Sequence, residues 1–389
     1  MYLTSDEEAM LNGEFGEGVR KAIELIVALG KVYDADGLVD ITSAHVSGAS
    51  YKTIGDGGLR YLEDVAKDSK VVVPSTLNPL GMDRDRWREM KIPEAFAKKQ
   101  LRIIELYENM GVRSTCSCTP YLGDNVPSFG DHVAWAESSA LSFVNSYIGA
   151  RTNREGGPGA LAAAIVGKTA NYGLHLDENR APTVIIDAEI GTSVFDHSLL
   201  GQAVGMRIGN GIPYFRGIDP DIDSVKTMAA AMAASGSVAM FHIENVTPEA
   251  GMYGTDGLET IHIGKSELKD AESKLNTADE VQLIAFGCPH LTEKEIHDMA
   301  VFLKDKKKKK DIDIWFCTSA ETRERCSSDV KILERFGKVL ADTCMVVAPI
   351  ESNFSVTGTN SAKAGNYLPT LCSQKVRCND FTRLMEVVL

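Results

Sequence analysis

The fold class is decided by residues 281–350, VQLIAFGCPHLTEKEIHDMAVFLKDKKKKKDIDIWFCTSAETRERCSSDVKILERFGKVLADTCMVVAPI. Apolar runs at 281–287, 312–319 and 344–350 have the length and bounding residues of buried strands. Between them, 291–305 and 327–342 carry helical patterns, and the first of these opens with a capping box of Thr292 and Glu295. This alternation of strand and helix predicts a parallel sheet flanked by helices.

The same mixture of elements extends toward the N-terminus. Apolar spacing predicts a helix at 16–33, and Ser5 with Glu8 indicates a capping box before it. The segment 41–68 has the pattern of a short strand, a turn of small residues and a helix, and 71–81 and 182–191 have the pattern of strands.

Chain length adds a prediction about domain organisation. A single core stops growing near about 250–300 residues, and this chain has 389. We therefore expect an α/β protein of several subdomains, with tentative boundaries at 1–115, 116–275 and 276–389.

The composition excludes several classes of protein. Hydrophobic residues make up 44% and charged residues 24%, which is typical of globular chains. A formal net charge of −13 argues against a general nucleic-acid binder. No apolar run approaches the ~20 residues that cross a bilayer, and the acidic N-terminus lacks the pattern of a signal peptide. We expect a cytoplasmic protein.

Cysteine carries most of the chemical information. Without an export signal, thiols act as core fillers, metal ligands or nucleophiles more often than as disulfides. No CxxC pair, Walker loop, HExxH or GxSxG is present, so ordinary zinc, nucleotide and serine-hydrolase sites lose their main support. The eight cysteines are Cys116, Cys118, Cys288, Cys317, Cys326, Cys344, Cys372 and Cys378.

Cys288 has the position of an active-site group. It follows a predicted strand and precedes a capped helix, and both the carboxyl end of a strand and a helix N-terminus favour a reactive thiolate. A buried structural cysteine is the alternative. His290 is expected to cap or line this site rather than to bind a metal.

The other cysteines are less decisive. Cys116 and Cys118 would point to the same side of an extended chain, so both could face a ligand or one could serve packing. Cys344 begins a predicted strand, and this position by itself favours a place in the core. The remaining four are weaker candidates.

Two turns of small residues have the properties of anion sites. The turn HVSGAS (45–50) offers free amides just before a predicted helix, and STLNPLG (75–81) is a second turn of this kind. Either could be an ordinary helix cap or connection instead.

Three basic residues could accompany these turns. Arg151 and Arg154 could clamp an oxyanion, or could pair structurally with Glu155 or Glu137. Lys363 stands among small residues that would let a ligand approach, although it could equally be a surface lysine.

Together these segments resemble the aconitase X family, and most of all its archaeal large subunits, over nearly the whole chain. The matching segments are SAHVSGASYKTIGDGGLRYLED (43–64), CTPYLGD (118–124), WAESSALSFVNSYIGARTNREGGP (135–158), YGLHLDENR (172–180), FGCPHLT (286–292), DTC (342–344) and TNSAKAGNY (359–367).

The resemblance implies an aconitase-like fold of several subdomains that lacks the swivelling domain, and a 4Fe–4S cluster. The implied thiolate ligands are Cys118, Cys288 and Cys344, with Cys116 as the replacement should Cys118 fail. The implied substrate contacts are Gly48, Ala49, Ser50, Asn78 and Pro79, and Lys363 is implied as a catalytic group, with Arg151 and Arg154 as added anion contacts.

The implied reaction is the dehydration of (R)-5-phosphomevalonate to trans-anhydromevalonate 5-phosphate in an archaeal mevalonate pathway to isoprenoids. Three thiolates leave one iron open, where it can act as a Lewis acid on the leaving hydroxyl. The resemblance also implies a separate small subunit in a heterodimer, which would supply a serine as the base. The alternatives are a cis-3-hydroxy-L-proline dehydratase and, in another class, a non-catalytic metal-binding scaffold.

Overall fold

Five parallel strands form the largest sheet of the chain, in the order β12-β11-β10-β13-β14. The computed structural model describes residues 1–389. The strands are β10 (Leu283–Phe286), β11 (Asp313–Thr318), β12 (Lys338–Ala341), β13 (Val356–Thr359) and β14 (Lys375–Cys378). Its helices are α10 (Glu293–Leu303), α11 (Ala320–Arg325), α12 (Ser327–Leu333), α13 (Ala362–Cys372) and α14 (Phe381–Glu386), with the short helix η5 (Ile350–Ser352).

The predicted parallel sheet is therefore confirmed, but its third strand was placed wrongly. The strand is Lys338–Ala341, whereas 344–350 is a buried turn. The helix predicted over 327–342 ends at Leu333, before Phe336 and Gly337. An apolar run shows that a segment is buried but does not distinguish a strand from a packed loop.

A second parallel sheet, in the order β8-β7-β6-β9, lies in the middle of the chain. Its strands are β6 (Val184–Ala188), β7 (Pro213–Arg216), β8 (His242–Ile243) and β9 (Thr260–Ile263). Its helices are α7 (Val194–Ile208), α8 (Ile222–Gly236) and α9 (Lys265–Leu275). The strand expected at 182–191 is confirmed as β6.

The N-terminal part holds a third parallel sheet, β3-β2-β4, and a two-stranded antiparallel pair, β1-β5. The strands are β1 (Leu38–Asp40), β2 (Ser43–Val46), β3 (Ser75–Leu77), β4 (Val133–Trp135) and β5 (Lys168–Ala170). The helices are α1 (Ser5–Leu11), α2 (Glu17–Val32), α3 (Tyr51–Val65), α4 (Glu94–Asn109), α5 (Ser138–Phe143) and α6 (Gly157–Val166), with the short helices η1 (Pro120–Leu122), η2 (Val144–Ile148), η3 (Gly173–His175) and η4 (Asp177–Asn179).

Local capping signals fixed the helix starts to within one residue. The Thr292–Glu295 capping box is confirmed at α10. The box at α1 consists of Thr4 and Glu7 rather than Ser5 and Glu8, because Thr4 takes the N-cap position. None of the helices combines the length and the apolar surface that a membrane span requires.

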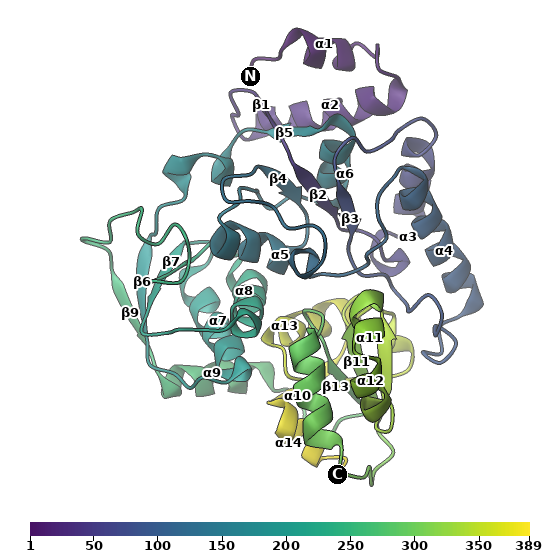
Figure 1. The fold of residues 1–389 in the computed structure, drawn as a ribbon, viewed down its shortest axis with the longest axis vertical. Helices are drawn as coiled ribbons and strands as arrows, with labels where there is room; N and C mark the ends of the chain where they lie inside the picture. The colour runs from purple at the N-terminus through teal and green to yellow at the C-terminus, as the bar shows by residue number, and fades with distance from the viewer.

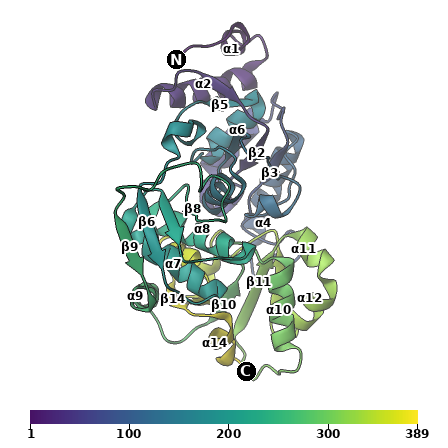
Figure 2. The same cartoon turned by 60° about the vertical axis from the view of Figure 1, so that its left-hand side comes forward.

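The three sheets meet around α5, α8 and α13, near the centre of Figure 1. Helices α5 and α13 both pack on α8, so the first and third sheet regions contact the second through one helix. The largest apolar cluster accordingly takes side chains from all three regions, from Met82 to Cys378. Figure 2 shows the N-terminal region at the top, with the middle and C-terminal regions beside each other below it. Residues far apart in the sequence are therefore held in place by one shared apolar core.

The turn after β10 depends on a close approach of two strands. Gly287 has φ +94°, and a Cβ there would lie 2.1 Å from the carbonyl oxygen of Cys317 on β11. Only glycine has both the backbone freedom and the small size for this position.

We expect Gly287→Ala to lower the free energy of unfolding by about 2–3 kcal/mol, because it combines an unfavourable φ with a backbone clash. Urea unfolding followed by circular dichroism measures this. Gly57→Ala is the matched control, since nothing lies within 4 Å of a Cβ at this exposed position of α3; it should be neutral or stabilise slightly. Equal stabilities for the two variants would contradict the close-approach argument.

Candidate active site

The structure brings Cys118, Cys288 and Cys344 together from three separate segments. Cys288 follows β10 and Cys344 follows β12, and the carboxyl ends of these parallel strands lie at one edge of the sheet. Cys118 comes from the loop between α4 and η1. All three are buried, with 5–6% of their surface exposed. The thiols of Cys288 and Cys344 hydrogen-bond each other, and Cys118 is close enough to both to influence their ionisation.

The three thiols ionise differently. Burial raises the pKa of Cys118 to about 12. The hydrogen bond with Cys344 and burial together raise the pKa of Cys288 well above its usual value. The same hydrogen bond, with the amides of Val346 and Val347, lowers the pKa of Cys344 to about 7. Cys344 is thus the thiol most easily converted to the thiolate that metals bind.

The donor set at this edge consists of three thiols. No group of three or more His, Cys, Asp or Glu side chains converges as a mononuclear site would require. Three thiols without carboxylate or imidazole donors match the ligands of iron–sulfur centres.

Cys116 belongs to different surroundings. Its φ is +47°, so the chain is not extended here and the expectation that Cys116 and Cys118 share one side is wrong. The Cys116 thiol donates to the Ser114 carbonyl at 3.3 Å and lies near Arg84 and Asp342.

The other four cysteines are also buried. Cys317 lies within β11 and Cys378 within β14, in the apolar core. Cys326 begins α12. Cys372 donates to the Val346 carbonyl at 3.2 Å, behind the turn that carries Cys344.

A buried ion pair stands beside the three thiols. Lys363, in the first turn of α13, pairs with Glu137, the N-cap of α5, and their exposed fractions are 6% and 5%. Lys363 also donates to Ser139 Oγ at 3.1 Å, and Glu137 accepts from the Ala140 amide at 2.6 Å. The alternative that Lys363 is a surface lysine is therefore wrong.

The pair holds both groups in their charged forms. Burial opposes the charge on Lys363, but the Glu137 carboxylate and the nearby Cys288 and Cys118 raise its pKa above the usual value. Burial likewise opposes the charge on Glu137, but Lys363 and hydrogen bonds from Ser139 and Ala140 lower its pKa. Both charges act on the thiols: Glu137 raises the pKa of Cys118 more than Lys363 lowers it, whereas Lys363 lowers the pKa of Cys288 and of Cys344.

The two predicted turns lie side by side, because β2 and β3 are parallel neighbours and the turns follow their carboxyl ends. The amide of Asn78 donates to the Val46 carbonyl at 2.9 Å. Ser50 is buried and donates to the Val347 carbonyl at 2.8 Å, so the first turn reaches the loop of Cys344. Gly48 has φ +81° and turns the chain between β2 and Ser50. Ala49 and Pro79 are buried in the same two turns.

His45 sets the orientation of Asn78. The Asn125 amide donates to Thr76 Oγ1 at 2.9 Å, Thr76 Oγ1 lies 2.8 Å from His45 Nδ1, and His45 Nε2 lies 3.3 Å from Asn78 Oδ1. Because Asn78 Oδ1 can only accept, Nε2 carries the proton and Nδ1 accepts from Thr76. Burial lowers the pKa of His45 to about 4, so the ring stays neutral. The Asn78 NH₂ group is left as a donor without a protein partner.

The ion pair and hydrogen bond of the two arginines go to groups other than the thiols. Arg151 forms an ion pair with Asp177. Arg154 is exposed and donates to the Ala233 carbonyl at 3.1 Å. Neither arginine pairs with Glu155 or Glu137, and the expected alternative of structural pairing with these two residues is therefore wrong.

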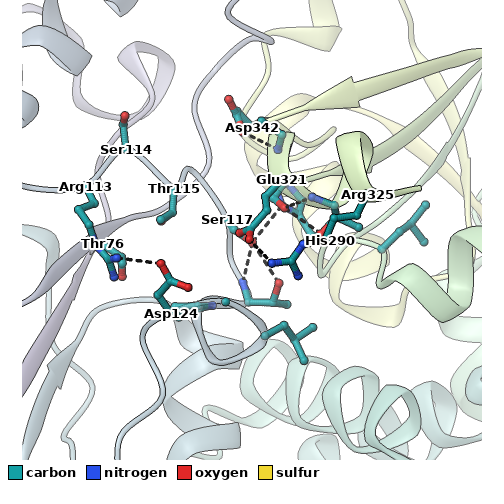
Figure 3. Close-up of a pocket in the computed structure, with 18 of the residues that line it drawn as sticks. Thr76, Arg113, Ser114, Thr115, Ser117, Asp124, His290, Glu321, Arg325 and Asp342 are labelled. Atoms are coloured by element: carbon teal, nitrogen blue, oxygen red, sulfur yellow. Dashed lines mark hydrogen bonds and ion pairs between the residues drawn. The ribbon is translucent and has the colours of Figure 1, made fainter. Parts of the chain in front are cut away.

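A polar cavity of about 360 Å³ lies behind this site (Figure 3). Ser117 and His290 line it, but none of the three cysteines does. Its arginines are neutralised, for example by the Arg113–Asp124 pair at 2.9 Å. The cavity therefore offers no unpaired cation to an anionic substrate.

Sequence reasoning missed the roles of His45, Glu137 and Ser139. His45 is a polar residue within a buried strand, and Glu137 precedes a helix as a cap would. Both signals were visible, but each residue's partner comes from a distant segment.

The chain matches known proteins along its whole length. Family models for the first, second and third domains of aconitase X match residues 1–178, 182–273 and 281–389. The phosphomevalonate dehydratase large subunit of Methanocaldococcus jannaschii is 50% identical over 403 residues, covering 99% of this chain and 100% of that protein. The cis-3-hydroxy-L-proline dehydratase of Pseudomonas aeruginosa is 33% identical, covering 96% of this chain and 68% of that enzyme.

A solved structure agrees over the full length. Aconitase X from Thermococcus kodakaraensis, in its holo-form, superposes with a TM-score of 0.93 at 43% identity and covers 100% of both chains. The expected aconitase-like α/β fold is confirmed.

We expect Lys363→Met to lower the free energy of unfolding by about 3–5 kcal/mol, because it leaves the Glu137 carboxylate buried without its counter-charge. The double variant Lys363→Met with Glu137→Gln should recover part of this loss. Urea unfolding of the wild type, both single variants and the double variant completes the cycle. Additive effects would mean that the pair is not coupled.

The pH dependence gives a second readout of the pair. The folded-state pKa of Glu137 is lowered, so its stabilising contribution is fully present above the usual carboxyl pKa of about 4.3 and is lost as the pH falls through the lowered value. The stability difference between wild type and the double variant should therefore shrink in acid. A constant difference would contradict the assignment.

Proposed function

Because the chain belongs to the aconitase X family and is a dehydratase, we propose that it dehydrates (R)-5-phosphomevalonate to trans-anhydromevalonate 5-phosphate as a large subunit. The observation that carries the proposal is the convergence of Cys118, Cys288 and Cys344 beside a buried ammonium group. Identity of 50% to an archaeal phosphomevalonate dehydratase large subunit, over its full length, supports the choice of substrate.

The three thiols would hold a 4Fe–4S cluster. Such a cluster, with three thiolate ligands, supplies an open iron that acts as a Lewis acid on a leaving hydroxyl. Thiols must lose their protons to bind metal, and the pKa of Cys118 and of Cys288 is raised. Loading would therefore release protons and should be favoured at higher pH.

The surrounding residues would bind and orient an anionic substrate. The Asn78 NH₂ group and the amides around Gly48 provide neutral donors at the carboxyl ends of β2 and β3. Lys363 provides the positive charge. Its raised pKa means that it acts as a donor and as a counter-charge, rather than as the base that removes the carbon-bound proton.

The base would come from a separate small subunit, as the relatives' designation as large subunits suggests. A site completed at a subunit interface is common for small ligands. The second candidate substrate is cis-3-hydroxy-L-proline, favoured by the relative at 33% identity.

We expect Cys118→Ala, Cys288→Ala and Cys344→Ala each to abolish cluster loading. The measurement is anaerobic reconstitution with iron and sulfide, followed by iron analysis and visible absorbance near ~400 nm. Cys116→Ala is the matched control, because its thiol bonds the Ser114 carbonyl in other surroundings; it should load as the wild type does. A colourless wild type would contradict the cluster.

We expect the reconstituted chain to be inactive alone and to dehydrate phosphomevalonate once the small subunit from the same organism is added. The assay follows alkene product by mass spectrometry with each of the two substrates, with and without that subunit. Full activity of the isolated chain would refute the need for a partner. If only cis-3-hydroxy-L-proline is dehydrated, the proposed substrate is wrong and the second candidate takes its place.

A further inference from the structure

His290 uses every hydrogen-bonding group it has, and each bond reaches a different part of the site. Its backbone amide donates to Cys118 Sγ at 3.2 Å, and its carbonyl accepts from Lys226 Nζ at 3.1 Å. Its ring lies 3.3 Å from Ser117 Oγ through Nδ1 and 3.0 Å from the Thr343 carbonyl through Nε2. The exposed fraction of the residue is 1%.

The partners identify the tautomer of the ring. The Thr343 carbonyl can only accept, so Nε2 carries the proton, and Nδ1 then accepts from the Ser117 hydroxyl. One rigid imidazole therefore spans the loop of Cys118 and the loop of Cys344, while its own backbone continues from Cys288.

A second set of contacts anchors this residue from behind. Lys226 on α8 is buried and pairs with Glu295, which caps α10 by accepting from the Thr292 amide at 2.9 Å. The His290 carbonyl is thus fixed to the middle region of the chain as well. His290 also lines the polar cavity of Figure 3.

We propose that His290 is a positioning residue that holds the loops of Cys118, Cys288 and Cys344 at the spacing a cluster needs, before any cluster is present. The inference rests on the cluster proposed above. It assigns His290 no contact with substrate and no ligand role. Arg84 also joins these segments, by donating to Asp342 and Ser114, but it lies further from the thiols along each loop. Without the ring, the loops of Cys118 and Cys344 would lose the side chain that joins them next to the thiols, and the cluster would be bound more weakly.

The test uses a set of variants that restore the two ring contacts one at a time. His290→Ala removes both contacts, His290→Gln can still donate to the Thr343 carbonyl, and His290→Asn can still accept from Ser117. Each protein is reconstituted anaerobically, and the rate of iron loss to a chelator is recorded from the decay of visible absorbance. His297→Ala is the matched control, since His297 is an exposed histidine of α10 paired with Asp329.

We expect iron loss about 10–100-fold faster in His290→Ala, the size of effect seen when residues behind metal ligands are changed. His290→Gln should stay within about tenfold of wild type, because one hydrogen bond is lost rather than two. His297→Ala should match wild type. Thermal unfolding of the apoproteins separates loosened loops from general destabilisation. If His290 had a purely structural role, His290→Ala would lower the melting temperature, and His290→Gln would not restore cluster retention.

Each outcome decides a different question. A wild type that takes up no iron overturns the proposed cluster and this inference with it. A wild type that loads normally, with His290→Ala retaining iron equally well, overturns the inference alone. If His290→Ala does not fold, Ser117→Ala and His290→Gln decide: release at the wild-type rate in both overturns the role of the ring.

Discussion

The buried ion pair between Lys363 and Glu137 is the constraint around which the site is organised. A cation in the first turn of a helix opposes the helix dipole, and burial adds a desolvation cost. Lys363 bears both costs at the start of α13 and is stabilised there by a carboxylate 226 residues away in sequence. A well-packed apolar pair would cost the fold less, so a positive charge beside three thiols is better explained by chemistry than by stability.

Parallel sheets explain how such distant groups meet. The turns after β2 and β3 lie at the carboxyl edge of one sheet, and Cys288 and Cys344 lie at the carboxyl edge of another. Ser50 joins the two edges through the Val347 carbonyl. Helix α8 contacts both α5 and α13, so it fixes the angle between the sheets that carry these edges.

Sequence reasoning recovered the parts that local chemistry determines. A capped helix after an apolar strand placed Cys288, and a turn rich in small residues placed Gly48 and Ser50. It placed Cys344 at the start of a strand, whereas Cys344 follows β12, because an apolar run does not reveal whether it pairs or packs. The partners of Glu137 and His290 could not be found from sequence, since they depend on contacts between segments hundreds of residues apart.

The ionisation states around the thiols also bear on where the catalytic base resides. Glu137 is committed to Lys363, and Lys363 keeps its proton. The Nδ1 lone pairs of His45 and His290 accept from Thr76 and Ser117, and burial lowers the pKa of both rings to about 4. None of these groups has both a free lone pair and a pKa suited to removing a proton near neutral pH. These four residues therefore bind, orient and neutralise charge, which agrees with the proposal that a partner supplies the base.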